Sequence, residues 1–563
     1  MATQPHGTQI QMTDIKPYES HVEDTKEEQI LKGTPILKSE LDNLSRWETV
    51  KRFWKAIVIC NMICFAAACD GYQINLNGNI IANPGFVERV GERNAAGKIA
   101  LTTHATATWG AVQSFGQLVG MWLLTPVSDR IGRKYMLYLL WLILFGSIMI
   151  ETFTKNWSQW AAAKFLAGTG IGCLQATLPI YVAEWAPANI RGGMLLAYSA
   201  WNHTGGFMGP LILFICKKTL GEHEYKIPIL TQWAFLGIML PIFLYLPETP
   251  SYYAARGLHD QGIAVLKRVN GGVKGYNVEG EYEIIKNIIV EEQERLAALG
   301  LEEHDWRGVL RSYVECFKGS NFKRTIAASL PASCQQLTGL AFLSGYASLF
   351  FKEAGFTNAF EITSILFGIK IFFVIVFALT TDRFGRRNIV IYLAGLCCAM
   401  LLVIGILGHV PHTNATKDVL IAAACFWSAG SVGLGAFGWS FAGEVAAQKL
   451  RARTSGLGSG IAVIFGLTFN TSVPIMLLDG GKRLGNNTYN TAFIFLGFGT
   501  VVWILTIFML PEVASRNPAE LDEMYEKGIS PWRMKNYITD VQRAHAARTG
   551  QPIPGDNQEE ERR

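Results

Sequence analysis

The sequence predicts an all-α polytopic membrane protein, with twelve transmembrane helices in two six-helix repeats and a cytoplasmic helical linker between them. Charged residues are only 17% of the 563 residues and hydrophobic residues are 50%, whereas soluble domains are about one-quarter charged. Apolar runs long enough to cross a bilayer recur along the chain. The charged turn Asp129–Lys134 recurs as Asp382–Arg387, again between apolar runs. This recurrence indicates a duplicated membrane unit.

The apolar runs form two groups of six. A helix of about 20 residues crosses about 30 Å of hydrocarbon. By this criterion the spans cover roughly 54–81, 101–126, 135–154, 159–183, 193–215 and 230–247, then 325–350, 360–381, 388–410, 419–443, 455–478 and 490–511. The first span contains Asp70, Gln73 and several asparagines. Polar groups at such depth are tolerated where they face a bundle interior or an aqueous cavity.

The spans divide the chain into five parts. These are an N-terminal tail (1–52), an N-terminal six-helix half (53–247), a linker (248–324), a C-terminal six-helix half (325–511) and a C-terminal tail (512–563). In the linker, glutamates alternate with isoleucines and leucines at helical spacing between Glu281 and Leu296, which predicts an amphipathic helix.

Charge and acceptor triplets predict the orientation. Lys and Arg are dense in the turns 129–134, 382–387 and 449–453, which is typical of the cytoplasmic side. N-glycosylation triplets begin at Asn156, Asn414 and Asn486, in loops that this topology places outside. We therefore expect cytoplasmic termini and glycosylation at these three asparagines.

Composition excludes several classes of partner. A formal charge of +5 is small for this length and does not favour a nucleic-acid partner. The ten cysteines match neither a disulfide framework nor a zinc site. The sequence also contains no phosphate-cradling loop, metal-ligand cluster or nucleophile motif. We therefore expect no enzyme activity, no metal and no cofactor.

Two further landmarks repeat in the same order as the charged turns. Glu184 with Arg191 recurs as Glu444 with Arg451, and Pro247-Glu248 recurs as Pro511-Glu512. Parallel six-helix repeats are typical of transporters, which form a midplane site between the repeats.

With these landmarks, three further motifs complete a pattern that resembles the sugar porter family of the major facilitator superfamily, in its fungal branch, over about 50–525. The motifs are Tyr181-Val182-Ala183-Glu184, Gln335-Gln336-Leu337-Thr338-Gly339 and Gly438-Trp439. The resemblance implies a transporter that moves a sugar or sugar-like small polar solute by alternating access. It also implies a location in the plasma membrane.

The charged landmarks are candidate cytoplasmic gates. A carboxylate beside an Arg-rich turn forms directional, reversible, charge-assisted bonds. The resemblance implies one cluster of Asp129, Arg130, Arg133, Glu184 and Arg191, and a second of Asp382, Arg383, Arg386, Glu444 and Arg451. The alternative is that these residues serve only as topology anchors.

The candidate substrate site centres on an amide pair. Buried amides are costly unless they are satisfied, and they both donate to and accept from hydroxyls. The resemblance implies that Gln335, Gln336 and Trp439 bind substrate. We add Thr338, Ser199 and Asn202 as candidates, and we expect His203 to serve an interhelical contact. Ala341, Ser199, Ala462 and Gly466 stand where the family usually carries amide side chains, so the pocket has lost several polar partners.

Proton coupling remains open. In the family's symporters, an Asp in a Gly-Tyr-Asp motif of span one takes up the proton near an Arg of span four. Here the motif reads Gly71-Tyr72-Gln73 and the span-four position is Lys164. Asp70 lies one helical turn from Gln73 and is the candidate substitute if it faces Lys164 or the cavity. The missing acid favours a facilitator over a proton symporter.

Two other hypotheses retain the same fold. An exporter of a small secondary metabolite is compatible with the eroded pocket. A non-transporting sensor is disfavoured, because such sensors carry long signalling tails and this tail is short. The expected partners are a small-molecule substrate, the lipid bilayer and, in the coupled case, protons. We expect a monomer.

Overall fold

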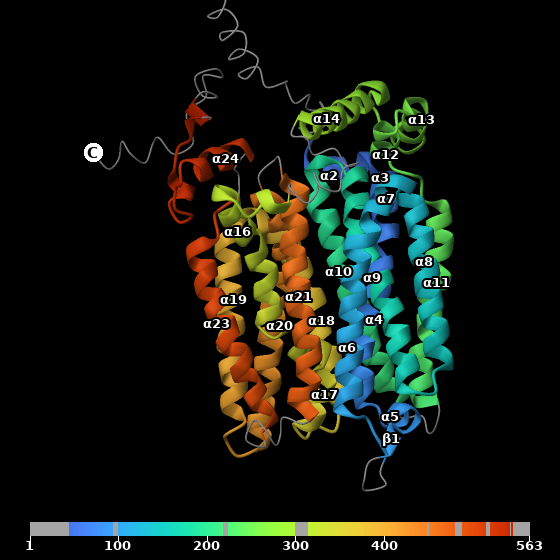
Figure 1. The fold of residues 1–563 in the computed structure, drawn as a ribbon, viewed down its shortest axis with the longest axis vertical. Coiled ribbons are helices and arrows are strands. Elements are labelled where there is room, and N and C mark those ends of the chain that lie inside the picture. Colours follow the sequence, from blue (N-terminus) through green and yellow to red (C-terminus); the bar gives the residue numbers. More distant parts are fainter. Residues whose placement is uncertain are drawn as a thin grey trace, which may run out of the picture.

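The structure is a computed structural model that describes residues 44–93, 99–217, 223–298, 313–446, 450–478, 487–513, 518–540 and 542–543. The described chain is a helical bundle with one antiparallel pair of short strands, β1 (Glu92–Arg93) and β2 (Ile99–Ala100). Figure 1 shows the N-terminal half, in blue to green, beside the C-terminal half, in yellow to red. This arrangement confirms the predicted all-α fold class.

Helices occupy each of the six spans predicted in the N-terminal half. The first span is α3 with α4, and the second is α6 with a π-helical turn and α7. In order, the elements are α3 (Trp54–Cys64), α4 (Ala66–Asn79), α6 (Thr103–Val119), η3 (Gly120–Leu124), α7 (Thr125–Ile131), α8 (Arg133–Phe153), α9 (Trp157–Trp185), α10 (Arg191–Cys216) and α11 (His223–Tyr245).

The C-terminal half follows the same plan, with its first span broken near Gly339. Gly339 has a φ of +94°, which favours glycine because it carries no Cβ. In order, the elements are α16 (Gly319–Leu337), η5 (Ala341–Gly345), α17 (Ala347–Glu353), α18 (Ala359–Phe384), α19 (Arg386–Leu407), α20 (Asn414–Val445), α21 (Arg451–Leu478) and α23 (Thr491–Met509).

The remaining elements lie at the two ends of the bundle. In Figure 1, α2, α14 and α24 lie at the end where α8 begins, and α5 and β1 lie at the opposite end. The amphipathic helix expected between Glu281 and Leu296 lies within α14. In order, these elements are α2 (Arg46–Arg52), η2 (Ile80–Ala82), α5 (Pro84–Val90), η4 (Ala188–Ile190), α12 (Pro250–Ala255), α13 (His259–Asn270), α14 (Val278–Ala298), η7 (Thr488–Asn490), α24 (Pro518–Glu526) and η8 (Met534–Asn536).

Hydropathy distinguishes three of the predicted spans from the other nine. Nine segments of the described chain are long and apolar enough to cross a membrane. The three other predicted spans, built on α6, α10 and α16, are helical but carry more polar and small residues. Such residues allow close helix packing: a Cβ added to Gly71 of α4 would lie 1.8 Å from the Asn202 carbonyl oxygen of α10.

The internal repeat has a structural counterpart at the charged turns. Gly132 and Gly385 adopt φ values of +101° and +75°. Directly after these glycines, Glu248 accepts the Arg133 backbone N–H at 3.1 Å, and Glu512 accepts the Arg386 backbone N–H at 3.2 Å. A carboxylate at a helix N-terminus satisfies free N–H groups and complements the helix dipole. The Pro-Glu landmarks therefore cap α8 and α19.

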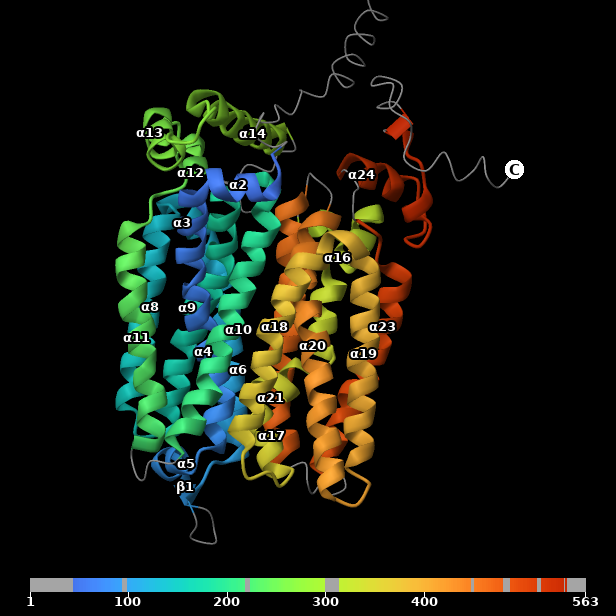
Figure 2. The same cartoon turned by 180° about the vertical axis from the view of Figure 1, so that it is seen from behind.

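Hydrogen bonds join the two halves near the end that carries α5 and α17. The Ser348 backbone N–H donates to Asn79 Oδ1 at 3.1 Å, and Lys352 Nζ donates to the Ala82 carbonyl oxygen at 3.1 Å. Along the bundle, α10 packs on α18 and α6 packs on α21; Figure 2 shows the first of these pairs from behind. The halves are thus held together at this end.

We predict that Gly132→Ala destabilises the protein by about 1–3 kcal/mol. The added Cβ would lie 2.4 Å from Glu248 Oε2, at a φ that L residues avoid. Gly146→Ala in α8 is the matched control, because its Cβ would meet nothing within 4 Å and alanine favours a helix. The measurement is the thermal unfolding midpoint of the purified protein in detergent. Equal midpoints for the two variants would contradict the capping role of this turn.

Candidate functional site

Asp70 lies inside the N-terminal half and is held by three neutral donors. It is buried on α4, at 1% exposure. Its carboxylate accepts hydrogen bonds from Gln175 Nε2 at 3.2 Å, Tyr198 Oη at 3.1 Å and Asn202 Nδ2 at 3.0 Å. Hydrogen bonds of this kind replace the hydration that a buried carboxylate loses. Asp70 thereby fixes the positions of polar side chains on α9 and α10.

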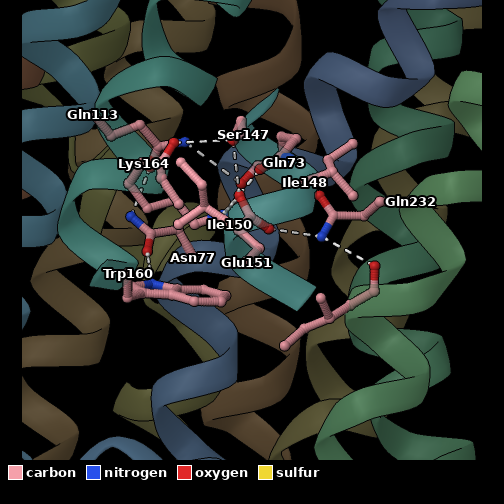
Figure 3. Close-up of polar contacts among 12 residues, drawn as sticks. Gln73, Asn77, Gln113, Ser147, Ile148, Ile150, Glu151, Trp160, Lys164 and Gln232 are labelled. Carbon is pink, nitrogen blue, oxygen red and sulfur yellow. Dashed lines mark hydrogen bonds and ion pairs between the residues drawn. The ribbon is translucent and has the colours of Figure 1, made fainter. Parts of the chain in front are cut away.

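Lys164 on α9 forms a fully buried ion pair with Glu151 on α8. Lys164 Nζ lies 2.9 Å from Glu151 Oε1, and both side chains are 0% exposed. The same ammonium donates to Gln73 Oε1 at 2.9 Å and lies 4.6 Å from the centroid of the Trp160 ring. Glu151 Oε2 accepts from Gln232 Nε2 of α11 at 2.8 Å. Figure 3 shows these contacts converging on Glu151.

This geometry changes what the sequence suggested about Lys164. Its carboxylate partner is Glu151, and Asp70 makes a separate set of contacts. Gln73 does meet Lys164, as its place in the motif suggested, but as an amide acceptor. Sequence reasoning missed Glu151, although an acid within the apolar run 135–154 is a signal of a buried partner or functional group.

A small cavity lies where the two halves meet. Its volume is about 30 Å³, room for about one water. Polar groups from both halves line it: Asn77, Gln113, Ser114, Gln117, Tyr346 and Asn470. Asn470 Nδ2 of α21 donates to Ser114 Oγ of α6 at 3.0 Å across the interface. The interface between the halves therefore presents amides and hydroxyls from both repeats at this cavity.

The cavity is connected to Asp70 by a chain of amides. Gln117 Nε2 donates to Gln175 Oε1 at 2.6 Å, and Gln175 donates in turn to Asp70. Gln113 accepts from Asn77 Nδ2 at 2.6 Å. Sequence reasoning missed Gln113 and Gln117, although two amides four residues apart in an apolar run mark one inward helix face.

The glutamine pair of α16 is divided between two roles. Gln335 is 8% exposed and donates from Nε2 to the Ser431 carbonyl oxygen at 3.0 Å. Gln336 is half-buried, and its side-chain amide makes no hydrogen bond within the described chain; its Oε1 lies 3.5 Å from the position of a Cβ on Gly466. Thr338 donates to the Cys334 carbonyl oxygen of its own span at 2.8 Å. We therefore leave Thr338 out of the proposed site.

Span five brings together part of the predicted set. Asn202 bonds Asp70, and the His203 ring lies 2.7 Å from the Ser199 carbonyl oxygen within the same helix. Ser199 is half-buried, and its hydroxyl makes no hydrogen bond in the described chain. The Trp439 side chain lies outside the described residues.

The N-terminal gate cluster forms in part. Arg133 Nη2 lies 3.0 Å from Asp129 Oδ1 and 3.4 Å from Glu184 Oε1, which connects α7, α8 and α9. The Arg130 side chain and Arg191 are exposed, and the Arg130 backbone carbonyl oxygen accepts from Arg256 of the linker.

The second gate cluster is described only at Arg386, whose backbone N–H is capped by Glu512. The side chains of Asp382, Arg383, Glu444 and Arg451 lie outside the described residues.

The glycosylation candidates differ in what the structure describes. Asn156 and Asn414 are exposed at the starts of α9 and α20, and the neighbouring Trp157 Nε1 donates to Glu92 of β1 at 2.8 Å. This places Asn156 at the end opposite the linker helices. Asn486 lies outside the described residues.

The sequence matches a family model along most of its length. Residues 59–525 match the model described as "Sugar (and other) transporter". The "Major facilitator-type transporter ecdD" of Aspergillus rugulosus is 26% identical, over 89% of this chain and 94% of its own length. The "Low-affinity glucose transporter HXT3" of Saccharomyces cerevisiae is 24% identical, over 86% of this chain and 85% of its own length.

Solved structures share the fold. The partially occluded inward-open xylose transporter XylE from E. coli superposes with a TM-score of 0.64 at 17% identity, covering 83% of this chain and 100% of that chain. XylE bound to 6-bromo-6-deoxy-D-glucose gives a TM-score of 0.63 at 18% identity, covering 85% of this chain and 100% of that chain. At such identity the likeness shows the fold alone, and it confirms the predicted major facilitator architecture.

We predict that Lys164→Met and Glu151→Gln each destabilise the protein by about 3–5 kcal/mol, because each leaves one buried charge without its partner. The double variant is expected to lose less than the sum of the two single losses. Lys55→Met, at an exposed site on α3, is the control for loss of a positive charge. Denaturation of the four purified variants measures the coupling. Additive losses would show that the two residues do not stabilise each other.

Proposed function

The chain belongs to the sugar (and other) transporter family, and from this premise we propose that it moves a sugar or sugar-like small polar solute by alternating access. The observation that carries the substrate class is the cavity between the halves, lined by amides and hydroxyls. Such groups both donate and accept, as vicinal hydroxyls of a solute require. Transporters with parallel repeats bind at this interface, near the midplane.

The proposed binding residues come from both halves. From the C-terminal half we propose Gln335 and Gln336, with Trp439 carried over from the family pattern. From the N-terminal half we propose Asn202, Ser199 and Gln117. Gln336 is the strongest candidate, because its half-buried amide has no partner in the described chain and gains hydrogen bonds when a solute enters. Removing such a bond costs about 0.5–1.5 kcal/mol.

The transport cycle would open and close the two ends of the bundle alternately. Bonds such as Ser348 to Asn79 support a state that is closed at the α5 and α17 end. We propose that the cluster of Asp129, Arg133 and Glu184, and its counterpart around Asp382 and Glu444, stabilise closure at the opposite end. The linker helices would brace this end, which we assign to the cytoplasm with both termini. We place the protein in the plasma membrane as a monomer.

We propose facilitated diffusion. Gln73 stands where the family's symporters carry an acid, and an amide does not titrate. The charge of Lys164 is balanced by Glu151 within the same half, so it requires no transported proton. The xylose transporter with the same fold is described as a proton symporter, and Asp70 is the residue of this chain that would carry a proton in a coupled mechanism.

A second candidate function is export of a small secondary metabolite. Gly466 faces Gln336 without a side chain of its own, and Ala341 also replaces an amide. These changes leave more room and fewer polar partners than a hexose site offers. The relative named as a major facilitator-type transporter, without a stated sugar, is compatible with this alternative.

We predict that Gln336→Leu lowers kcat/KM for the transported solute by roughly ten-fold, since about 1.4 kcal/mol of hydrogen bonding corresponds to a factor of ten. Thr338→Val is the matched control on the same span, because its hydroxyl bonds only its own helix in the described chain. The measurement is uptake into proteoliposomes across a panel of sugars, polyols and sugar acids. Unchanged transport in Gln336→Leu would remove this residue from the site.

We predict that uptake is not accompanied by alkalinisation of the external medium, because span one carries Gln73 in place of a titratable acid. The external pH is recorded during uptake by the wild type and by Asp70→Asn. Substrate-driven alkalinisation in the wild type that is absent in Asp70→Asn would contradict the facilitator and assign the proton to Asp70.

A further inference from the structure

Lys370 is a buried lysine that lies outside the set of proposed binding residues. It lies on α18 at 2% exposure. Its ammonium donates to Ser344 Oγ of η5 at 2.7 Å. It also lies 4.4 Å from the ring centroid of Phe367 and 5.6 Å from that of Trp427. Lys370 thus contacts one hydroxyl and two aromatic rings, and His203 of α10 and Cys397 of α19 lie close enough to interact with it electrostatically.

Other buried cations of the described chain have carboxylate partners. Lys164 pairs with Glu151, and Arg324 pairs with Asp522. Within the described residues, no carboxylate lies within ion-pair distance of Lys370. Burying an ammonium is costly unless a counter-charge balances it, and contacts with aromatic rings offset only part of that cost. A charge left in this condition inside a membrane protein indicates function.

Lys370 lies beside the interface between the halves. Its partner Ser344 directly precedes Gly345 and Tyr346, which line the central cavity. Phe367, one turn before Lys370, contacts α10 of the other half: a Cβ on Gly206 would lie 2.5 Å from its ring. In sequence, Lys370 precedes Asp382 by the same number of residues as the cavity-lining Gln117 precedes Asp129. Lys370 is therefore linked through Ser344 to the segment that lines the cavity between the halves.

We propose that Lys370 binds a carboxylate of the transported solute, so that the preferred substrate is an organic acid of sugar-like size and not a neutral sugar. This inference rests on the proposed function and deepens it. The acid supplies the counter-charge that the chain lacks at this position. In the loaded transporter the solute carboxylate is paired with Lys370, and in the empty transporter Lys370 remains without it.

Nearby groups suit the rest of such a solute. Trp427 and Phe367 offer apolar faces to a ring, and the Trp427 indole N–H is already fixed on the Thr338 carbonyl oxygen at 2.8 Å. Ser431, one turn beyond Trp427, has a buried hydroxyl without a partner in the described chain. The Ser431 carbonyl oxygen accepts from Gln335, which links this region to the glutamine pair. A hydroxylated acid therefore finds both a cation and hydroxyl partners.

The test uses the full-length protein and two solutes that differ in one group. D-glucose and D-glucuronate share a ring, and only the second carries a carboxylate. Thermal stabilisation by each solute gives its affinity, and uptake into proteoliposomes gives its transport. The variants are Lys370→Met, which removes the charge, and Lys370→Arg, which keeps it. Lys417→Met is the matched control, because Lys417 also lies over a ring, that of Phe356, but is only half-buried, near the start of α20.

We expect the wild type to bind glucuronate at least ten-fold more tightly than glucose. Lys370→Met is expected to remove this preference while glucose binding persists, since breaking a buried charge pair costs more than a neutral contact. Lys370→Arg and Lys417→Met should retain the preference. Glucose binding by Lys370→Met also shows that this variant is folded.

Three outcomes overturn the inference. Equal binding of both solutes in the wild type, unchanged by Lys370→Met, would contradict it while the proposed function stands. Binding of neither solute would contradict the proposed function as well. The third outcome concerns chloride. If replacing isethionate by chloride in the buffer stabilises the protein as much as glucuronate does, and Lys370→Met abolishes this effect, then Lys370 binds an inorganic anion.

Discussion

The ion pair between Lys164 and Glu151 holds the N-terminal half together. Hydrocarbon supplies no water to a buried charge, so each charge needs a partner within the protein. Here the pair joins α9 to α8, and the amides Gln73 and Gln232 extend it to α4 and α11. Separating α8 from α9 would leave both charges unbalanced, and moving α4 or α11 away would remove an amide hydrogen bond from the pair. The N-terminal half is therefore constrained to move as one body.

Beside the hydrogen bond from Lys352 Nζ to the Ala82 carbonyl oxygen, the interface between the halves is held by contacts between neutral groups. Ser348 with Asn79, and Ser114 with Asn470, are neutral hydrogen bonds. Each contributes about 0.5–1.5 kcal/mol net, whereas removing one partner from a buried ion pair costs about 3–5 kcal/mol. The difference in magnitude determines where the molecule can open. Neutral contacts exchange partners readily, so motion at the interface costs less than motion within a half.

Repetition and charged turns made the fold predictable, and the site was predictable only in part. Glu248 and Glu512 were recognised as landmarks, but their role as helix caps depends on a tertiary contact that no local pattern contains. The family motif correctly associated Gln73 with Lys164. Glu151 was missed because it lies at the end of an apolar run, where an acid is easily taken for a loop residue. Thr338 belongs to the glutamine motif, but its hydroxyl faces its own helix. The sequence shows which polar residues a helix carries, but helix packing decides which face of that helix lines the cavity.

The two repeats share their backbone structure at the charged turns but differ in where their buried charges lie. Gly132 and Gly385 make the same turn, and glutamates cap the helices that follow both. However, the spacing of Glu184 and Glu444 places Ala424 at the position of Lys164, and the spacing of Asp129 and Asp382 places Ile404 at that of Glu151. Both residues are apolar and buried. At these two positions the C-terminal half carries no ion pair, while Lys370 contacts a hydroxyl and aromatic rings and, among the described residues, has no carboxylate within ion-pair distance. In the N-terminal half Glu151 balances the charge of Lys164, whereas Lys370 has no carboxylate partner among the described residues and lies beside the interface through which a solute would pass. In a transporter, an unpaired charge at this place favours a solute that carries the opposite charge.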